Sequence, residues 1–241
     1  MTLNLMRLQP DAKALAAWAA RYKVLSPDGD YGYALHGLLS AAFGEQAPQP
    51  FRYMGNKQDL LAYTPENLGI LRLHASMAAP DVARALGLDA LDARPFPGTW
   101  KEGKALDFEV RVRPVIRAKD GRERDVFLHA AESIPPEEGY GIEQRSIVYL
   151  DWLIKQFAVD GAAQINQAQM DEFHLTRVLR KAGADENGKR KTLGVTGPDA
   201  VFKGHLQVGN PDAFAHLLAR GVGRHRAFGF GMLLLKPASS C

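Results

Sequence analysis

The chain has 241 residues, 46% of them hydrophobic and 24% charged, a balance typical of folded globular proteins. Its formal net charge is only +3, which does not by itself indicate a nucleic-acid partner. Such a partner can be inferred only from where the basic residues cluster along the chain. A single cysteine, Cys241, excludes an intramolecular disulfide and a Cys-based zinc site, and no apolar run approaches the roughly 20 residues that span a bilayer. Since the N-terminus also lacks a secretory signal pattern, we expect a soluble, cytoplasmic protein with no membrane partner.

The first 93 residues are expected to form one α+β domain. Leucines at positions 3, 5 and 8 predict an opening strand, and Asp11 is suited to cap the Ala-rich helix that follows. Leu35, Leu38 and Leu39 form an apolar stripe along a second helix, which Gly44 ends. The expected elements, in chain order, are a strand at 3–8, helices at 11–22 and 31–43, strands at 51–54, 59–63 and 68–76, and a helix at 80–86.

The stretch 93–103 contains two prolines and two glycines and predicts a domain boundary. We therefore expect an N-terminal domain at 1–93, a linker at 94–103 and a C-terminal domain at 104–241. The expected elements of the second domain are a strand at 105–116, a basic turn at 117–124, a loop at 135–139, a helix at 142–158, strands near 172–179 and 200–208, a helix at 212–219 and a strand at 228–235. Each half approximates β-α-β-β-α-β, the ferredoxin-like plan.

A glycine-rich loop, residues 221–231, reads GVGRHRAFGFG. Four glycines allow positive φ angles and a close approach of the backbone to a ligand, and Arg220, Arg224 and Arg226 add cationic groups that suit phosphate oxygens. A dinucleotide fingerprint is excluded, because Arg226 stands where the third glycine would be needed and too few residues follow for a βαβ unit. Taken alone, the loop fits two interpretations, a phosphate-binding loop and a simple turn between a helix and a strand.

Basic residues also gather on both arms of a predicted hairpin around the turn 182–188. One interpretation is a solvated surface hairpin. The other is a surface that follows the phosphates of A-form RNA, with the basic turn at 117–124 extending it. The basic residues of the hairpin are Arg177, Arg180, Lys181, Lys189, Arg190 and Lys191.

Several segments resemble the RAMP superfamily, and within it the CasE branch, the repeat-cleaving subunits of Cascade-type CRISPR systems. Residues 202–211, FKGHLQVGNP, match the family pattern FxGxLxVxxP, and the glycine-rich loop is similar to the family's G-I/V-GxxKxF/LGxGLL. Arg226 stands where the family usually has lysine, and Met232 where it has leucine. The other patches are FEVRVRP at 108–114, which departs from the family at Glu109 and Arg113, SIVYLDWL at 146–153, and YALH at 33–36.

The resemblance implies a fold of two tandem ferredoxin-like (RRM-like) domains and a metal-independent endoribonuclease that needs no cofactor. It implies that Tyr33 and His36 are catalytic. Without the resemblance, a histidine on a helix more often has a structural role or lies at the surface. Whether His36 acts as base or acid is open. The implied partners are CRISPR repeat RNA and other Cascade-type effector subunits. The implied RNA-binding residues are Arg111, Arg113, Arg117, Arg177, Arg180, Lys181, Lys189, Arg190, Lys191, Gly221, Gly223, Arg224, His225 and Arg226.

Three alternatives compete with this interpretation. A metal-dependent nuclease would need convergent carboxylates or paired histidines, but the sequence has no HxxxH, and Glu137 and Glu138 lie in a Pro/Gly loop. A non-catalytic RAMP subunit would share the glycine-rich loop and bind guide RNA without cutting it. A generic RRM-like binder would carry an aromatic-rich strand that the sequence lacks.

Overall fold

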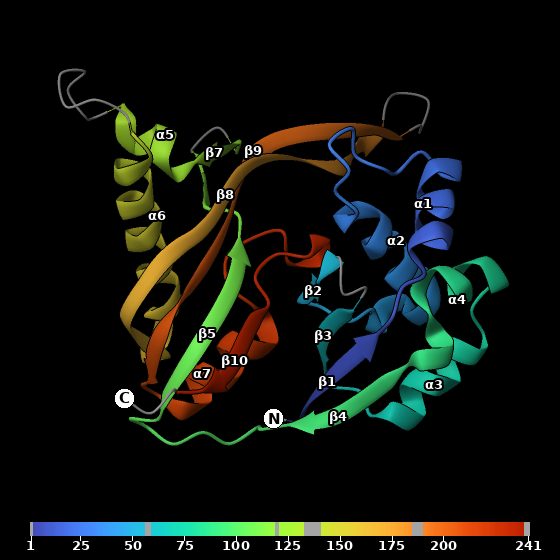
Figure 1. Ribbon diagram of the computed structural model, residues 1–241, viewed down its shortest axis with the longest axis horizontal. Helices are drawn as coiled ribbons and strands as arrows, with labels where there is room; N and C mark the ends of the chain where they lie inside the picture. Colours follow the sequence, from blue (N-terminus) through green and yellow to red (C-terminus); the bar gives the residue numbers. More distant parts are fainter. Residues whose placement is uncertain (1, 56–58, 119–120, 133–140, 185–189, 239–241) are drawn as a thin grey trace. The chain divides into compact units, whose positions relative to one another are not determined.

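A computed structural model describes residues 2–55, 59–118, 121–132, 141–184 and 190–238 (Figure 1). The chain divides into two compact units. Within the described part of the chain, no helix is both long and apolar enough to cross a membrane. Unit 1 comprises Met1–Phe96, Thr176–Thr196 and Ala227–Gly229, and unit 2 comprises Pro97–Leu175, Gly197–Arg226 and Phe230–Cys241.

Unit 1 is built on a four-stranded sheet with the order β2-β3-β1-β4, in which every neighbouring pair is antiparallel. This is the ferredoxin-like order, with the first strand at the centre. In its described part, four α-helices and the 3-10 turns η1 (Gly44–Gln46) and η3 (Leu88–Ala90) accompany the sheet. The strands are β1 (Leu3–Leu8), β2 (Phe51–Tyr53), β3 (Leu60–Thr64) and β4 (Asp92–Phe96), and the helices are α1 (Ala12–Arg21), α2 (Gly32–Phe43), α3 (Leu68–Ser76) and α4 (Pro80–Leu86).

The core of unit 1 follows from the predicted apolar stripe. Leu35, Leu38 and Leu39 of α2 are buried against Met6 and Leu8 of β1. At the start of α1, the Asp11 carboxylate accepts a hydrogen bond of 2.7 Å from the Ala14 N–H, which is the predicted N-cap. The two helices predicted between residues 11 and 43 are therefore confirmed, and they are separate helices.

The strand predicted at 68–76 is wrong, because this segment is helix α3. Its alternation of leucines with Arg72 and His74 suggests a strand, but the Asn67 side chain accepts a hydrogen bond of 3.1 Å from the Ile70 N–H and starts a helix. Helical spacing then places Leu71 in the core and leaves Leu73 62% exposed. Packing of one helical face prevails over the local alternation.

Unit 2 repeats the same sheet order as β10-β5-β9-β8. Alternate residues of β5 are buried, and the Phe108 ring lies 5.2 Å from the Phe157 ring of α6. Both units therefore have the predicted ferredoxin-like fold. The main elements are β5 (Ala105–Val112), α6 (Ile142–Phe157), β8 (Ala163–Ala184), β9 (Arg190–Val208), α7 (Pro211–Arg220) and β10 (Leu233–Pro237), with a small hairpin of β6 (Val115–Arg117) and β7 (Glu123–Asp125) followed by α5 (Val126–Ala131).

Four details of unit 2 differ from the sequence prediction. The strand expected at 105–116 is split at Pro114, which has no N–H to donate. The strands expected at 172–179 and 200–208 are parts of the much longer β8 and β9, and α5 was not predicted. The last strand begins at Leu233 and not at Phe228, because Arg226–Phe228 form a 3-10 turn, η6, and Gly229 and Gly231 adopt φ of +85° and +78°. The loop expected at 135–139 lies outside the described residues.

The predicted linker at 94–103 begins inside β4, whose last residue is Phe96. Two segments that are distant in sequence also belong to unit 1, namely the outer part of the β8–β9 hairpin and residues 227–229 of the glycine-rich loop. The boundary between separately folding domains stays a prediction.

Candidate functional site

Tyr33 and His36 lie one turn apart on α2, and their ring centroids are 6.5 Å apart. Both side chains are half-buried, whereas Leu35 and Leu38 on the neighbouring face are fully buried. Because the leucines hold α2 in the core, the two rings project from a rigid element. The helix thus presents a phenol and an imidazole together at the surface of unit 1.

Phe228 completes this group of rings. It comes from η6, at the end of the glycine-rich loop, and its centroid lies 6.0 Å from Tyr33 and 5.2 Å from His36, edge-on to the imidazole. Gly32, the first residue of α2, explains how the loop approaches: a Cβ at this position would lie 2.3 Å from the Phe228 carbonyl oxygen. We call Tyr33, His36 and Phe228 the aromatic cluster. Sequence reasoning did not single out Phe228, although the aromatic position of the loop motif marked it.

The chemistry of the cluster is that of proton transfer and hydrogen bonding. Burial raises the pKa of Tyr33, so its hydroxyl keeps its proton at neutral pH and acts as a donor. Imidazole side chains in general accept and release protons near neutrality. A pocket of about 180 Å³ adjoins the cluster, with His36, Ser40 and Ala227 among its lining residues.

The remainder of the glycine-rich loop belongs to unit 2, where it is held by contacts within the protein. The Arg224 Nε donates to Glu123 Oε1 at 2.7 Å, and the His225 Nε2 lies 2.8 Å from Glu123 Oε2. The hydrogen bond from His225, more than any other contact, lowers the pKa of Glu123 to about 2, although burial opposes the shift. His225 is nearly buried, at 7% side-chain exposure, and has a φ of +60°.

The glycines of this loop have packing roles that the sequence left open. Gly221 and Gly223 adopt φ of +78° and +71°, and a Cβ on Gly223 would lie 2.9 Å from the Trp152 ring of α6. The Val222 N–H donates to the Gly231 carbonyl at 2.8 Å. The interpretation as a tight turn is therefore observed, and contact of Gly221 or Gly223 with RNA stays a prediction.

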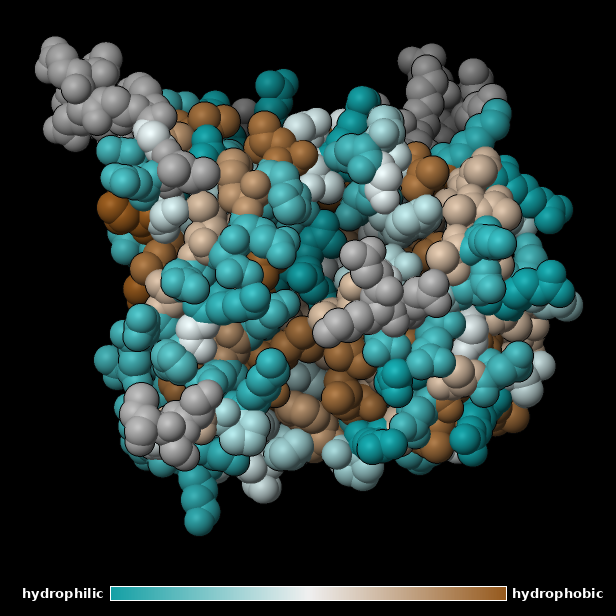
Figure 2. Space-filling view, viewed as in Figure 1, coloured by the Kyte–Doolittle hydropathy of each residue, from teal (hydrophilic) through white to brown (hydrophobic). Residues whose placement is uncertain are grey.

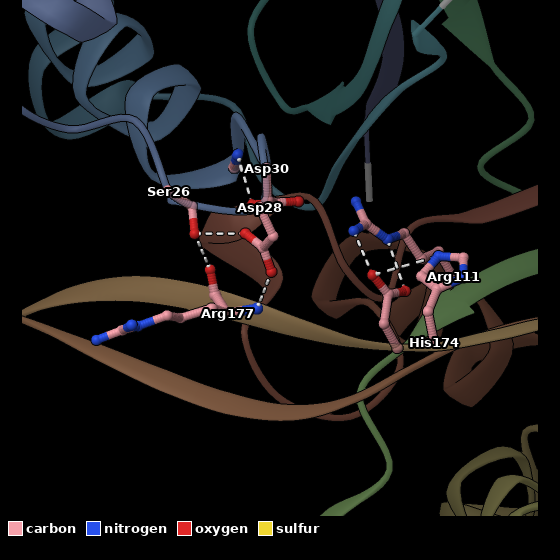
Figure 3. A network of polar contacts seen from close by, with 8 residues as sticks. Ser26, Asp28, Asp30, Arg111, His174 and Arg177 are labelled. Atoms are coloured by element: carbon pink, nitrogen blue, oxygen red, sulfur yellow. Dashed lines mark hydrogen bonds and ion pairs between the residues drawn. The ribbon is translucent and has the colours of Figure 1, made fainter.

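Two of the arginines expected to bind RNA are engaged inside unit 2. Arg111 donates to both oxygens of the buried Asp199, at 2.9 and 2.5 Å, and its guanidinium lies 4.4 Å from the centre of the Phe230 ring. Figure 3 shows Arg111 beside this carboxylate, together with His174. Arg113 is only 1% exposed, and its guanidinium packs against Gly197. These contacts give both residues a structural role, and neither offers a freely accessible cation.

The exposed side of β5 and β9 in unit 2 carries ion pairs. His205 Nδ1 lies 2.6 Å from Asp107 Oδ1, and Lys203 Nζ lies 2.6 Å from Asp171 Oδ2 on β8. At described positions 107, 109, 111, 203 and 205, this surface is charged rather than aromatic. It does not resemble the base-stacking sheet of a generic RRM.

The basic hairpin is anchored to unit 1 through its backbone. The Arg177 N–H donates to Asp28 Oδ2 at 2.5 Å, and Ser26 Oγ lies 2.6 Å from Asp28 Oδ1 and contacts the Arg177 carbonyl (Figure 3). Burial would raise the pKa of Asp28, but the hydrogen bonds from Ser26 and the Arg177 backbone outweigh it and lower that pKa. The Arg177 side chain is exposed. The anchor fixes where the hairpin begins and leaves its cation accessible.

The other predicted basic residues are described only in part. Arg117 is exposed and donates to the Gly121 carbonyl at 3.4 Å, whereas the half-buried Arg226 donates to the Arg220 carbonyl at 2.7 Å. Lys189 lies outside the described residues. Figure 2 shows that hydrophilic side chains cover much of the visible face. For Arg180, Lys181, Arg190 and Lys191, only the backbone in β8 and β9 is described.

No group of three or more potential metal ligands occurs among the described residues. Metal independence stays a prediction.

A model of the family "CRISPR associated protein" matches residues 3–237. No curated protein matches the chain. Solved structures share its fold: CRISPR endoribonuclease Cse3 bound to a 19 nt RNA is 19% identical with a TM-score of 0.65, covering 98% of this chain and 100% of the other. Thermus thermophilus Cse3, bound to an RNA that represents a pre-cleavage complex, is 18% identical with a TM-score of 0.63 and the same coverage. At these identities the likeness shows a common fold, in agreement with the ferredoxin-like topology of both units.

Proposed function

The chain belongs to the family of CRISPR associated proteins, and on this premise we propose that it is an endoribonuclease that binds the repeat stem-loop of CRISPR RNA and cuts it without a metal ion. The observation that carries this proposal is the aromatic cluster, where the glycine-rich loop packs on the helix that bears Tyr33 and His36. A protein of the same fold is described as CRISPR endoribonuclease Cse3 bound to RNA. We assign the same class of activity to this chain.

In the proposed reaction, the ribose 2′-oxygen attacks the adjacent phosphorus while its proton passes to a base. A P–O2′ bond forms and the P–O5′ bond breaks, so the products are a 2′,3′-cyclic phosphate and a 5′-hydroxyl that receives a proton. His36 carries out one of these two proton transfers. Tyr33 remains a phenol, because burial raises its pKa, and it donates either a hydrogen bond to a phosphate oxygen or the proton that the 5′-oxygen needs.

The arginines of the glycine-rich loop support a role in phosphate binding. Burial, followed by the charges of Arg220 and Arg224, lowers the pKa of Arg226. Guanidinium groups that repel one another gain free energy when an anion binds between them. We therefore assign Arg224 and Arg226 to the phosphates of the repeat stem, together with the exposed Arg177 and Arg117. The basic hairpin residues are also assigned to phosphate contacts on their charge, namely Arg180, Lys181, Lys189, Arg190 and Lys191.

Cutting at the 3′ base of the stem would leave the stem-loop on the enzyme, since the contacts that bind the substrate stem are also those of the product. We propose that the product stays bound and that the protein works in the cytoplasm with other subunits of a Cascade-type effector complex. Co-purification of cleaved RNA with the protein would test this retention.

The decisive experiment is incubation of wild-type protein and His36→Ala with repeat RNA in EDTA. We expect the wild type to cut and His36→Ala to bind RNA without cutting. His74→Ala is the matched control, because His74 is also a half-buried helical histidine of unit 1 but belongs to α3.

Undiminished cutting by His36→Ala would overturn the assignment of this residue, and loss of wild-type cutting in EDTA would overturn metal independence. Binding without any cutting by the wild type would instead favour a RAMP subunit that only holds guide RNA.

A further inference from the structure

The pocket beside His36 is also lined by residues that have no role in the proposed cleavage reaction. It continues from His36 to Ser40, one turn later on α2, and then to Glu45 of η1, and Gln49 and Phe51 complete it. Its volume of about 180 Å³ lies below the roughly 300 Å³ at which pockets for drug-sized ligands begin. The pocket therefore suits one flat ring system and not an entire nucleotide.

The lining of the pocket combines apolar walls with hydrogen-bonding groups. Leu39 and Phe51 line the pocket although they are almost completely buried, whereas Glu45 and Gln49 are exposed and offer a carboxylate and an amide. The described lining residues include neither arginine nor lysine. Because a carboxylate repels a phosphate and no arginine or lysine among the described lining residues balances it, the pocket fits an uncharged group that has hydrogen-bond donors.

The position of the pocket relates it to the cleaved bond. Along α2, Tyr33 lies one turn before His36 and Ser40 one turn after it, so Ser40 is about 6 Å beyond His36 along the helix axis. A phosphate held at Tyr33 and His36 would thus lie next to the pocket, whose lining runs from His36 to Ser40 one helical turn later. Unpaired bases are commonly splayed out of RNA and recognised on their edges by side chains.

We propose that this pocket binds the base of a nucleotide next to the cleaved bond, and that Glu45 and Gln49 contact its hydrogen-bonding edge. The inference rests on the proposed endoribonuclease function. A carboxylate accepts hydrogen bonds from exocyclic amino groups, so the pocket favours cytosine, adenine or guanine over uracil. Recognition at the cut site is then separate from recognition of the stem.

The test compares wild-type protein with the double variant Glu45→Ala/Gln49→Ala in single-turnover cleavage. The substrates are repeat RNA and two forms with an abasic nucleotide immediately 5′ or 3′ of the cleaved bond. We expect one abasic substitution to slow the wild type on the order of tenfold, and the double variant to be slowed by a similar factor on normal RNA. On that abasic RNA the double variant should show no further loss, because the two changes remove the same contact.

Gln46→Ala is the matched control, since Gln46 lies in the same 3-10 turn but does not line the pocket. It should cleave all three RNAs like the wild type, and a thermal unfolding midpoint checks that each variant is folded. Wild-type rates for the double variant on normal RNA, or losses that multiply at both abasic positions, would overturn the proposal.

A binding measurement separates this proposal from the proposed cleavage. The fluorescent base 2-aminopurine, which carries an amino group, is placed at each flanking position, and its emission is followed on protein binding. Wild-type protein should change the emission at one position, Glu45→Ala/Gln49→Ala should reduce that change, and His36→Ala should retain most of it. Equal responses of wild type and double variant at both positions would overturn the base pocket even if cleavage is confirmed. If the wild type cuts no repeat, a response that depends on Glu45 and Gln49 would still support the base pocket.

Discussion

His36 and His225 are two of the histidines in segments that carry family motifs, and the structure gives them opposite surroundings. His36 projects from a rigid helix of unit 1 and is half-buried; it lies beside the rings of Tyr33 and Phe228 and lines a pocket. His225 lies in the glycine-rich loop within unit 2, 7% exposed, and contacts Glu123 at 2.8 Å. A histidine that exchanges protons with a substrate must be reachable by it. We therefore propose proton transfer for His36 and positioning of the glycine-rich loop for His225.

The largest effect that separates the two histidines should be on cleavage rate. We expect His36→Ala to reduce the single-turnover rate by roughly 10²- to 10⁴-fold at unchanged RNA affinity, the range for losing a general acid or base. His225→Ala should act mainly on RNA affinity, with a much smaller loss of rate under saturating protein. Cleavage rates of both variants at saturating protein test this prediction. Equal losses of rate would contradict the different roles of the two histidines.

The close packing of the glycine-rich loop against α2 should be disrupted by a side chain at position 32. Gly32→Ala places a methyl group where the Phe228 carbonyl lies, so we expect a loss of about 1–3 kcal/mol in unfolding free energy together with slower cleavage. Gly37→Ala on the same helix is the control, because its Cβ would meet only the Trp18 ring, at 3.3 Å. Chemical denaturation of both variants measures the difference, and a Gly32→Ala variant as stable as Gly37→Ala would contradict it.

The contact between Glu123 and His225 should appear in the pH dependence of stability. A carboxyl whose pKa is lowered to about 2 on folding stabilises the protein above its unfolded value near 4.5, and this contribution disappears as the pH falls from about 4.5 to about 2. After a discount for solvent screening, we expect Glu123→Gln to cost about 1–2 kcal/mol at neutral pH.

The difference in unfolding free energy between wild type and Glu123→Gln should shrink to near zero at about pH 2. Denaturant unfolding of both proteins between pH 7 and pH 2.5 measures this difference. A difference that does not change with pH would show that Glu123 acts through packing and not through its charge.

The smallest predicted effect concerns the salt dependence of RNA binding. Arg226→Gln should weaken binding of all repeat sequences and lower the slope of log affinity against log salt by about 0.7–0.9, as expected when one phosphate contact is lost. Lys236→Gln is the control, because Lys236 is an exposed lysine of β10 in the same unit and outside the predicted surface. An unchanged slope for Arg226→Gln would remove this residue from the phosphate-binding set.

Local patterns determined a large part of the architecture. The strand pattern of β5, the apolar stripe of α2 and the N-cap at Asp11 follow from neighbouring residues, and the ferredoxin-like plan follows from the order of the elements. The prediction failed at α3, where an alternating pattern competes with packing of one helical face. It also failed at the start of β10, where positive φ angles at Gly229 and Gly231 delay the strand.

Sequence by itself determined the family of this protein, its two ferredoxin-like halves and the placement of Tyr33 and His36 on one side of a helix, because motifs and helical spacing are local properties. Only the tertiary structure decided which distant groups meet them. It brought Phe228 close to His36 and explained why residue 32 is a glycine. It also paired Arg111 with the buried Asp199 and buried Arg113. Such contacts depend on how buried surfaces fit together across the chain, and no local pattern contains that information.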